Sequence, residues 1–299
     1  MTAMPATVIA TYSRRMRVRL GDGTTCDARI KGKKLKPVCG DSVATELIVD
    51  EDDLLITAIL ERRNQLTRTN LRGKKEVLAA NVDKLIVVAA ATPKPDWFVV
   101  DRYLCAAELM NVAGVVVFNK EDLGIDTAAR QALDVFEKLG YLSICTSAEN
   151  DHNIAALADL VGTGLAIIVG QSGVGKSTLI NRISAGNQQK TASISSKHRE
   201  GRHTTVNSVM IATRNGGAII DSPGVRDYAP MLESVDDVKH GFREVRETGQ
   251  RCRFANCRHL KEPGCAVKTA VDSGDIDARR YESYRRAVFL AENINRDRY

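Results

Sequence analysis

The sequence predicts a chain of three parts: an all-β barrel, a larger α/β sheet and a mainly helical unit that holds a metal site. Three observations predict this order. Basic and apolar residues alternate near the N-terminus, long apolar runs alternate with amphipathic segments in the middle, and three cysteines and a histidine lie close together near the C-terminus. We place the three parts at residues 1–75, 76–230 and 231–299.

The composition is that of a folded globular protein. Of the 299 residues, 43% are hydrophobic and 27% are charged. There is no apolar run of about eighteen residues and no signal-peptide pattern, so we expect no membrane partner and a cytoplasmic location. Seven cysteines, an odd number, argue against a secreted disulfide framework. Nothing in the sequence requires more than a monomer.

The first part carries the net positive charge. Residues 1–75 hold 15 Lys and Arg against 9 Asp and Glu, which equals the +6 of the whole chain. Arg15, Arg17 and Arg19 alternate with apolar residues, as in a strand with one basic face, and we expect the same of residues 28–33. Short strands with Gly-Asp turns predict a small barrel of the oligonucleotide-binding (OB) type that contacts RNA. A solvated basic face is the alternative.

The middle part alternates apolar runs with amphipathic segments. Residues 83–92, 114–122 and 165–170 contain the continuous apolar runs of strands that are covered on both faces. Residues 101–110 and 127–140 have helical patterning between them. This alternation predicts a doubly wound α/β sheet.

A phosphate-binding loop follows the last of these runs. Residues 170–177 read Gly-Gln-Ser-Gly-Val-Gly-Lys-Ser and stand between an apolar strand and a helix, the context that this motif requires. Backbone N–H groups of such a loop bind phosphates together with the helix N-terminus. Lys176 would reach the β- and γ-phosphates, and Ser177 would ligate Mg²⁺. The expected phosphate-binding residues are Gly170, Gln171, Ser172, Gly173, Val174, Gly175, Lys176, Ser177 and Thr178.

Two later segments complete the expected magnesium site. Asp221 ends an apolar run and would hold the Mg²⁺ ion, and the N–H of Gly224 would sense the γ-phosphate. The polar segment 201–208 lies in the chain between the phosphate loop and Asp221. Here we expect Thr205 to complete the magnesium coordination, with Thr204 as the rival residue.

A guanine-reading pattern precedes the phosphate loop. Asn119, Lys120 and Asp122 form an Asn-Lys-x-Asp pattern at the end of a strand. The Asp122 carboxylate can accept from the N1–H and the amino group of guanine, a donor pair that adenine lacks. The stem of Lys120 would pack over the base, and Asn119 would tie the loops together. Ser147 and Ala148 follow the next strand, and the backbone N–H of Ala148 could meet the guanine O6. The alternative is an ATP-dependent enzyme in which this short pattern is a coincidence.

The cysteine cluster predicts a structural zinc site. Cys252, Cys257, His259 and Cys265 supply four soft ligands and leave no open position, as in closed tetrahedral Zn²⁺ sites. Packed thiols beside a surface histidine are the alternative. The remaining cysteines are expected to be small core residues: Cys26, Cys39, Cys105 and Cys145.

Taken together, these motifs resemble the ribosome small subunit-dependent GTPase A family (RsgA/YjeQ/EngC). In that family, as here, the guanine motif precedes the phosphate loop, which is a circular permutation of the usual order. The resemblance covers essentially the whole chain. It implies a circularly permuted α/β P-loop GTPase domain between an OB-fold barrel and a helical zinc-binding domain. It also implies rRNA binding, and GTP hydrolysis to GDP and phosphate that the small (30S) ribosomal subunit stimulates, as a checkpoint in late maturation of that subunit.

The catalytic residue is the least defined part of this resemblance. Many GTPases carry a Gln directly after Asp-x-x-Gly to orient the attacking water, but this chain has Val225. The family shares a hydrophobic residue there and a Gly-Arg-His-Thr-Thr segment, which makes His203 the candidate. His203 could instead contact RNA or stabilise its loop. Val225 also favours a second hypothesis, an RNA-binding scaffold in which hydrolysis is vestigial.

Overall fold

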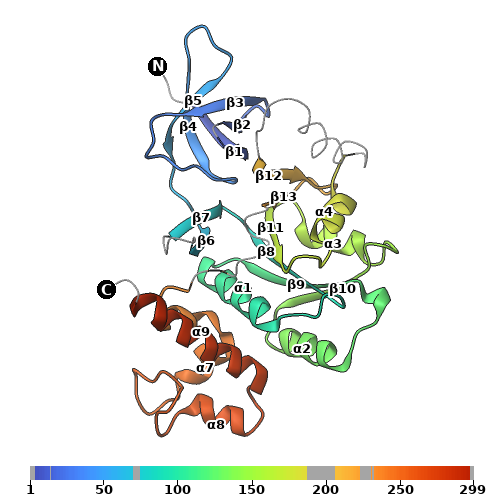
Figure 1. Ribbon diagram of the computed structural model, residues 1–299, viewed down its shortest axis with the longest axis vertical. Coiled ribbons are helices and arrows are strands. Elements are labelled where there is room, and N and C mark those ends of the chain that lie inside the picture. The colour runs from blue at the N-terminus through green and yellow to red at the C-terminus, as the bar shows by residue number, and fades with distance from the viewer. Residues whose placement is uncertain are drawn as a thin grey trace.

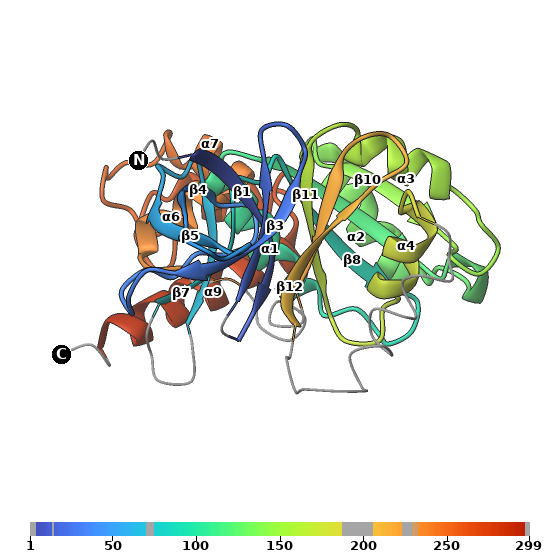
Figure 2. The same cartoon turned by 90° about the horizontal axis from the view of Figure 1, so that it is seen from above.

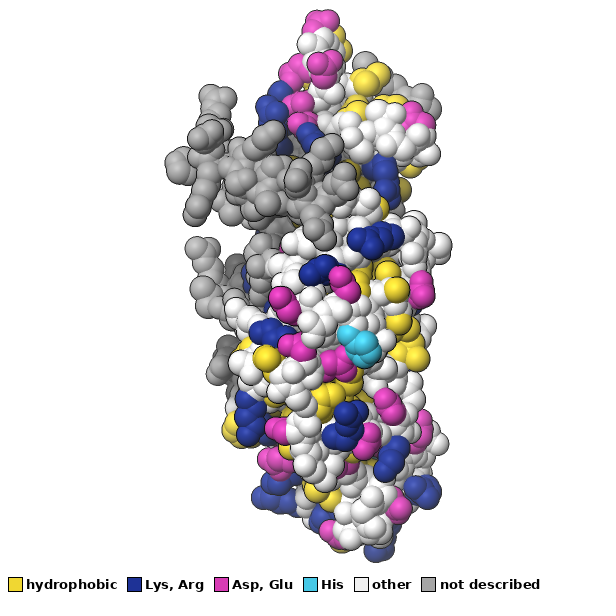
Figure 3. Space-filling view, turned by 90° about the vertical axis from the view of Figure 1, so that its right-hand side faces the viewer, with side chains coloured by type: hydrophobic (Ala, Val, Ile, Leu, Met, Phe, Trp, Pro, Cys, Tyr) yellow, Lys and Arg dark blue, Asp and Glu magenta, His cyan; other side chains and the backbone are white. Residues whose placement is uncertain are grey.

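The computed structural model describes residues 4–13, 15–69, 75–186, 206–222, 230 and 232–296. The predicted barrel, α/β sheet and helical unit follow one another along the longest axis of the molecule (Figure 1). On the face in Figure 3, the described basic and acidic side chains are interspersed from one end to the other. The surface there therefore shows both signs of charge.

Five strands close the N-terminal barrel. They are β1 (Met4–Tyr12), β2 (Met16–Leu20), β3 (Thr25–Ile30), β4 (Ser42–Leu47) and β5 (Leu54–Ile59). Their order is β1-β2-β3-β5-β4, and β4 pairs back onto β1. The core holds apolar side chains from alternate strand positions, including Val8, Val18, Val43 and Ile56.

The predicted basic face is present on β2 but only in part on β3. Along β2, Met16 and Val18 are buried while Arg17 and Arg19 are exposed, which confirms the alternation. The prediction for residues 28–33 is wrong beyond Ile30, where β3 ends. Gly32 has a φ of 73°, and this left-handed conformation interrupts the extended chain.

Acidic side chains partly neutralise this face. Arg17 donates to Asp27 across the β2–β3 pair at 2.9 Å. Arg29 donates to Asp53 at 2.9 Å and also pairs with Glu51. The number of arginines on this face therefore overstates its positive potential.

The α/β part is built on five parallel strands in the order β10-β9-β8-β11-β13. These are β8 (Lys84–Ala90), β9 (Ala113–Asn119), β10 (Leu142–Thr146), β11 (Leu165–Gly170) and β13 (Ala218–Asp221). The helices are α1 (Trp97–Met110), α2 (Thr127–Lys138), α3 (Ile154–Val161) and α4 (Lys176–Ile183), with a short 3₁₀ turn, η1, at Glu121–Leu123. The predicted strands and helices are thus confirmed.

Helices cover both faces of this sheet. Along β8, Leu85, Val87 and Ala89 pack in one core with residues of α1 and α2. The alternate residues Ile86, Val88 and Ala90 pack in a second core with α3 and α4. Because both side-chain sets of one strand are buried, the strand is apolar throughout, as the sequence shows.

Helix α1 begins earlier than the predicted residue 101. Asp96 adopts an extended conformation and caps the helix, since its carboxylate accepts from the N–H groups of Phe98 and Val99. The N-cap thus fixes the start of α1 directly beside the phosphate loop described below.

The barrel and the α/β part share one eleven-stranded sheet. Strand β12 (Val206–Ala212) lies antiparallel beside β13 and pairs on its other edge with β1. Figure 2 shows β12 next to the barrel strands. A separate hairpin of β6 (Gln65–Thr69) and β7 (Lys75–Ala80) crosses the predicted boundary at residue 75.

The described residues of the C-terminal unit form α6 (Val235–Gly241), α7 (Arg243–Gly249), α8 (Ala266–Asp272) and α9 (Ala278–Arg296). Of these helices, α6, α7 and α9 contact α1. Gly241 lies against Cys105 of α1, where a Cβ atom would come within 1.9 Å of the cysteine sulfur. Within the described ranges, no helix has both the length and the apolar character needed to cross a membrane.

The four cysteines outside the cluster lie in apolar cores. Cys39 and Cys105 are buried, and Cys26 and Cys145 are partly buried against the barrel and sheet cores. This agrees with their prediction as small core residues.

Candidate functional site

The predicted nucleotide-binding segments meet at the carboxyl edge of the parallel sheet. Strand β9 ends at Asn119, β10 at Thr146, β11 at Gly170 and β13 at Asp221. Ligands of open α/β sheets bind outside this edge. The fold therefore brings together segments that lie far apart in the chain. Of the predicted site residues, His203, Thr205 and Gly224 lie outside the described residues, as does Thr204.

The phosphate loop depends on glycines at two close approaches. Gly170 has a φ of 136°, and a Cβ there would lie 2.1 Å from the carbonyl oxygen of Val88. Gly175 has a φ of 95°, and a Cβ there would lie 2.4 Å from the side-chain nitrogen of Asn119. No other residue type fits these positions without displacing the strand or the guanine segment.

Lys176 lies inside the loop at the start of α4. Its side chain is buried, and Nζ donates to the carbonyl oxygen of Gly170 at 2.7 Å and to that of Gln171. Ser177 and Thr178 are exposed in the first turn of the helix. The loop thus encloses the lysine and leaves both hydroxyl residues accessible.

Asn119 links three loops from a buried position. Its Nδ2 donates to the carbonyl oxygen of Val174 in the phosphate loop at 2.9 Å. Its Oδ1 accepts from the Thr146 hydroxyl at 3.1 Å and from the N–H of Ala148 at 3.3 Å. In this structure the Ala148 N–H, which we expect to meet the guanine O6, is directed at Asn119. The guanine segments are therefore attached directly to the phosphate loop.

Asp122 is exposed and held by one neighbour. Its Oδ1 accepts from the Ser147 hydroxyl at 2.5 Å, and that hydroxyl accepts in turn from the N–H of Asn150. Lys120 has a φ of 59°, and its Nζ donates to the carbonyl oxygens of Thr92 and Gly173, each at 2.8 Å. The lysine stem thus spans from the segment before α1 to the phosphate loop.

Sequence reasoning missed the segment 92–96 that supports the phosphate loop. Besides the Lys120 contact to Thr92, the N–H of Asp96 donates to the side-chain oxygen of Gln171 at 2.8 Å. The only signal in the sequence is a pair of prolines, Pro93 and Pro95, which indicate a turn but no ligand. The contact therefore depends on the folded arrangement of β8, α1 and β11.

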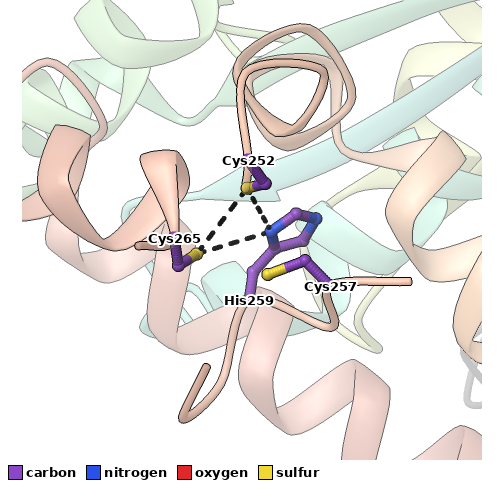
Figure 4. A group of neighbouring side chains, drawn as sticks. All are labelled: Cys252, Cys257, His259 and Cys265. Atoms are coloured by element: carbon purple, nitrogen blue, oxygen red, sulfur yellow. Dashed lines mark hydrogen bonds between the residues drawn. The ribbon is translucent and has the colours of Figure 1, made fainter. Parts of the chain in front are cut away.

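The four predicted zinc ligands converge (Figure 4). Nδ1 of His259 lies 3.4 Å from the Cys252 sulfur and 3.5 Å from the Cys265 sulfur, and these sulfurs lie 4.0 Å apart. All four ligand atoms, including that of Cys257, lie within 4.8 Å of one another. Tetrahedral Zn²⁺ spaces its sulfur and nitrogen ligands by roughly 3.5–3.8 Å, from bond lengths of about 2.0–2.3 Å. The cluster is compatible with a zinc site.

The chain around the cluster is held by buried hydroxyls and one carboxylate. The hydroxyls of Tyr281 and Tyr284 donate to the carbonyl oxygens of His259 and Arg258, at 2.7 and 2.8 Å. Burial opposes ionisation of Glu262, but hydrogen bonds from backbone N–H groups of the 258–262 turn outweigh it and lower the pKa to about 2. The turn that places His259 is therefore fixed from both sides.

A buried ion-pair network anchors this unit on α1. Arg280, 1% exposed, donates to Glu244 at 2.7 and 3.0 Å and to Asp101 at 2.8 Å. Burial alone would lower the pKa of Arg280, but Glu244 and Asp101 raise it well above its ordinary value. Arg279 also donates to Asp101 at 2.8 Å. The buried charges of Arg280, Asp101 and Glu244 are thus compensated by one another and by Arg279.

Comparison with known proteins agrees with this arrangement. Residues 59–230 match the RsgA GTPase family. The small ribosomal subunit biogenesis GTPase RsgA of Actinobacillus succinogenes is 36% identical over 248 residues, which cover 82% of this chain and 71% of that protein. RsgA of Saccharophagus degradans is 34% identical over 299 residues, 96% of this chain and 87% of that protein.

Solved structures of the same architecture cover nearly the whole chain. The crystal structure of YjeQ from Thermotoga maritima has a TM-score of 0.75 at 27% identity and covers 97% of this chain and 99% of its own. The circularly permuted GTPase YloQ has a TM-score of 0.71 at 23% identity and covers 98% and 96%; it shares the fold. The order of motifs, the fold and the relatives agree that this chain belongs to the RsgA GTPase family and is a circularly permuted GTP hydrolase.

Proposed function

We propose that the protein is a GTPase of small ribosomal subunit biogenesis that works as a monomer in the cytoplasm. It binds the small (30S) subunit and its rRNA, and GTP hydrolysis to GDP and phosphate releases it as a checkpoint in late maturation. The names of the relatives support the partner. The observation that carries the nucleotide part is the buried Asn119, which attaches both guanine segments to the phosphate loop despite their reversed order in the chain.

In this proposal each loop has one task. The carboxylate of Asp122, held by Ser147, accepts from guanine, and the stem of Lys120 covers the base. The N–H groups of residues 170–178 bind the phosphates, and Lys176 turns from its loop carbonyls to the β- and γ-phosphates. Magnesium bound with GTP supplies positive charge beside the phosphates, held by Ser177, Thr205 and Asp221.

Control of the attacking water is assigned to His203. Val225 has no group that can orient a water molecule, so we expect slow hydrolysis by the protein alone. Binding of the small subunit then brings His203 to the γ-phosphate, whose position the N–H of Gly224 senses. This accounts for a GTPase whose hydrolysis is slow until its partner is bound.

The two flanking units make the proposed contacts with the subunit. We keep the division into residues 1–75, 76–230 and 231–299. The exposed arginines of β2 favour RNA backbone contact, because few aromatic side chains accompany them. The four-ligand cluster holds one structural Zn²⁺ ion per chain, since no ligand position is left for a reacting water.

Steady-state hydrolysis of GTP and of ATP, each with and without purified small subunits, tests this proposal. We expect a low rate with GTP alone, a rise of at least about tenfold with small subunits, and no rise with large subunits. Hydrolysis of ATP at the GTP rate would contradict the role of Asp122. Subunit binding without any rise in rate would favour the scaffold hypothesis and remove the role of His203.

A further inference from the structure

The barrel lies one strand away from the predicted magnesium ligand. In the shared sheet, Ala10 of β1 is paired with Val209 of β12, and Val209 is paired with Asp221 of β13. In the next row, Thr11 of β1 is paired with Ser208. The end of the first barrel strand is thus connected through β12 to the end of β13, and Figure 1 shows β1, β12 and β13 in this succession.

Two buried serine hydroxyls extend this connection beyond the last backbone pair. Ser208 and Ser222 are 6% and 4% exposed, and their hydroxyl oxygens are hydrogen-bonded to each other at 2.9 Å. Both hydroxyls also lie near the carbonyl oxygen of Asn207, at 2.7 and 3.4 Å. Pairing of β12 with β13 ends at Val209 and Asp221, so this hydroxyl contact attaches the following residue, Ser222, to β12.

A polar pair at this position needs an explanation. On the same face of the sheet, the alternate residues Ile220 of β13 and Met210 of β12 pack in an apolar core, so an apolar side chain is the ordinary choice here. Buried hydroxyls are tolerated when they bind each other or the backbone, as here. Ser222 directly follows Asp221 in the chain, and Ser208 is paired with Thr11 of the barrel strand β1. The pair therefore links the barrel strand to the residue next to Asp221.

We propose that the Ser208–Ser222 hydroxyl pair is a positioning contact through which the barrel sets the location of Asp221. This inference rests on the proposed stimulation by the small subunit. When the barrel binds its partner, a shift of β1 moves β12 by their shared backbone pairs. The hydroxyl contact then moves Ser222, and with it the adjacent carboxylate, relative to the phosphate loop at the end of β11.

The decisive measurement is the subunit-stimulated kcat and KM of S208A, S222A and the double variant. We expect each single variant to lose about fivefold in stimulated kcat, the effect of one neutral hydrogen bond, with KM for GTP within about twofold. The double variant should lose no more than either single variant, because both remove one interaction. S208T keeps the hydroxyl group, so its stimulated kcat should be close to that of the wild type and not to that of S208A.

S184A is the matched control. Ser184 is equally buried, but its hydroxyl donates to the carbonyl oxygen of Asn181 in its own helix. A loss of stimulated kcat in S184A similar to that of S222A would show a general effect of removing buried hydroxyls and overturn the proposal. Wild-type kcat in S208A and S222A, or additive losses in the double variant, would overturn it as well.

A second measurement separates this proposal from the proposed function. Amide hydrogen exchange of residues 10–12 is compared between the GDP-bound and GTP-analogue-bound protein, without ribosomes. We expect the two nucleotides to give different exchange rates in the wild type and equal rates in S222A. If small subunits fail to stimulate the wild type, the proposed function fails, and this exchange experiment alone decides on the serine pair. Equal exchange rates of residues 10–12 with the two nucleotides in the wild type would overturn the proposed role of the serine pair.

Discussion

At the residue scale, Asp122 is the residue to which we assign the choice of base in the proposed function. Its carboxylate is exposed, and Ser147 holds one of its oxygens. In D122N an amide replaces the acceptor pair, so we expect GTP affinity to fall by about 100-fold, which corresponds to one or two charge-assisted hydrogen bonds. Binding of xanthine nucleotides should rise, because xanthine has a carbonyl oxygen where guanine has its amino group. Competition titrations with GDP and xanthosine diphosphate measure both effects.

The neighbouring carboxylate supplies the control for D122N. Glu121 lies in the same turn and contacts His152 instead of Ser147. E121Q should therefore leave GDP affinity within about threefold, because it removes a partly exposed contact and leaves the Asp122 carboxylate in place. Equal losses in the two variants would mean that the turn, and not the Asp122 carboxylate, determines affinity.

Gly175 is one of the residues where the phosphate loop lies against the guanine segment. In G175A the new Cβ would lie 2.4 Å from Asn119 Nδ2, at a φ of 95°. We expect a loss of about 1–3 kcal/mol in unfolding free energy and a loss of GDP binding, because the buried Asn119 must move. Gly124 has nearly the same φ, 92°, but nothing lies within 4 Å of its Cβ position. G124A should thus be strained but keep GDP affinity, as fluorescence titration and thermal unfolding can show.

At the scale of the elements, α1 joins the nucleotide site to the C-terminal unit. Asp96 at its start contacts Gln171, and Asp101 on its buried face binds Arg280. In R280M both Asp101 and Glu244 lose a buried partner, and we expect the unfolding free energy to fall by about 3–5 kcal/mol. Arg279 is more exposed, at 29% of its side chain, so R279M should cost about 1 kcal/mol.

Trp97 reports this unfolding directly. It is the only tryptophan of the chain and stands at the start of α1, where it packs against Phe118 and Phe136. Urea titration followed by its fluorescence therefore measures the stability of the α1 contacts in both variants. Equal midpoints for R280M and the wild type would mean that apolar packing, such as Cys105 on Gly241, suffices to hold the unit.

The elements also show what sequence patterns can and cannot predict. Continuous apolar runs predicted the parallel strands, because a strand covered on both faces needs apolar residues at every position. The end of β3 at Ile30 and the start of α1 at Trp97 were missed, since each depends on one local feature, Gly32 or the Asp96 cap. The pairing of β1 with β12 leaves no periodic trace in the sequence, so the contact of the serine hydroxyls could not be predicted.

The same division applies to the candidate site. The short motifs predicted Asn119, Lys176 and the four residues of the cysteine–histidine cluster from their spacing, because the chemistry of such motifs fixes their residue types. The partners that hold them, such as Thr92 for Lys120 and Tyr281 for the carbonyl of His259, come from distant segments through ordinary residue types. Such supporting contacts follow from the fold and not from a motif.

At the scale of the whole molecule, the cysteine–histidine cluster, for which we propose zinc, and the nucleotide loops lie on separate units that are joined through α1. Cys252, Cys257, His259 and Cys265 are held by the chain between α7 and α8. The Arg280 network that anchors the unit on α1 includes none of these ligands. Removal of zinc by a chelator should therefore loosen the cluster and leave GDP affinity within about threefold, while stimulation by small subunits is lost.

Metal analysis, GDP titration and hydrolysis with small subunits test this expectation on the same sample. The protein should contain one zinc per chain, C257S should contain none, and C26S, which changes a barrel cysteine, should keep its zinc. Loss of GDP binding together with zinc would mean that α1 transmits the state of the cluster to the phosphate loop through Asp96 and Gln171. Retained stimulation without zinc would instead place the contact with the subunit on the barrel, which reaches the nucleotide site through β1 and β12.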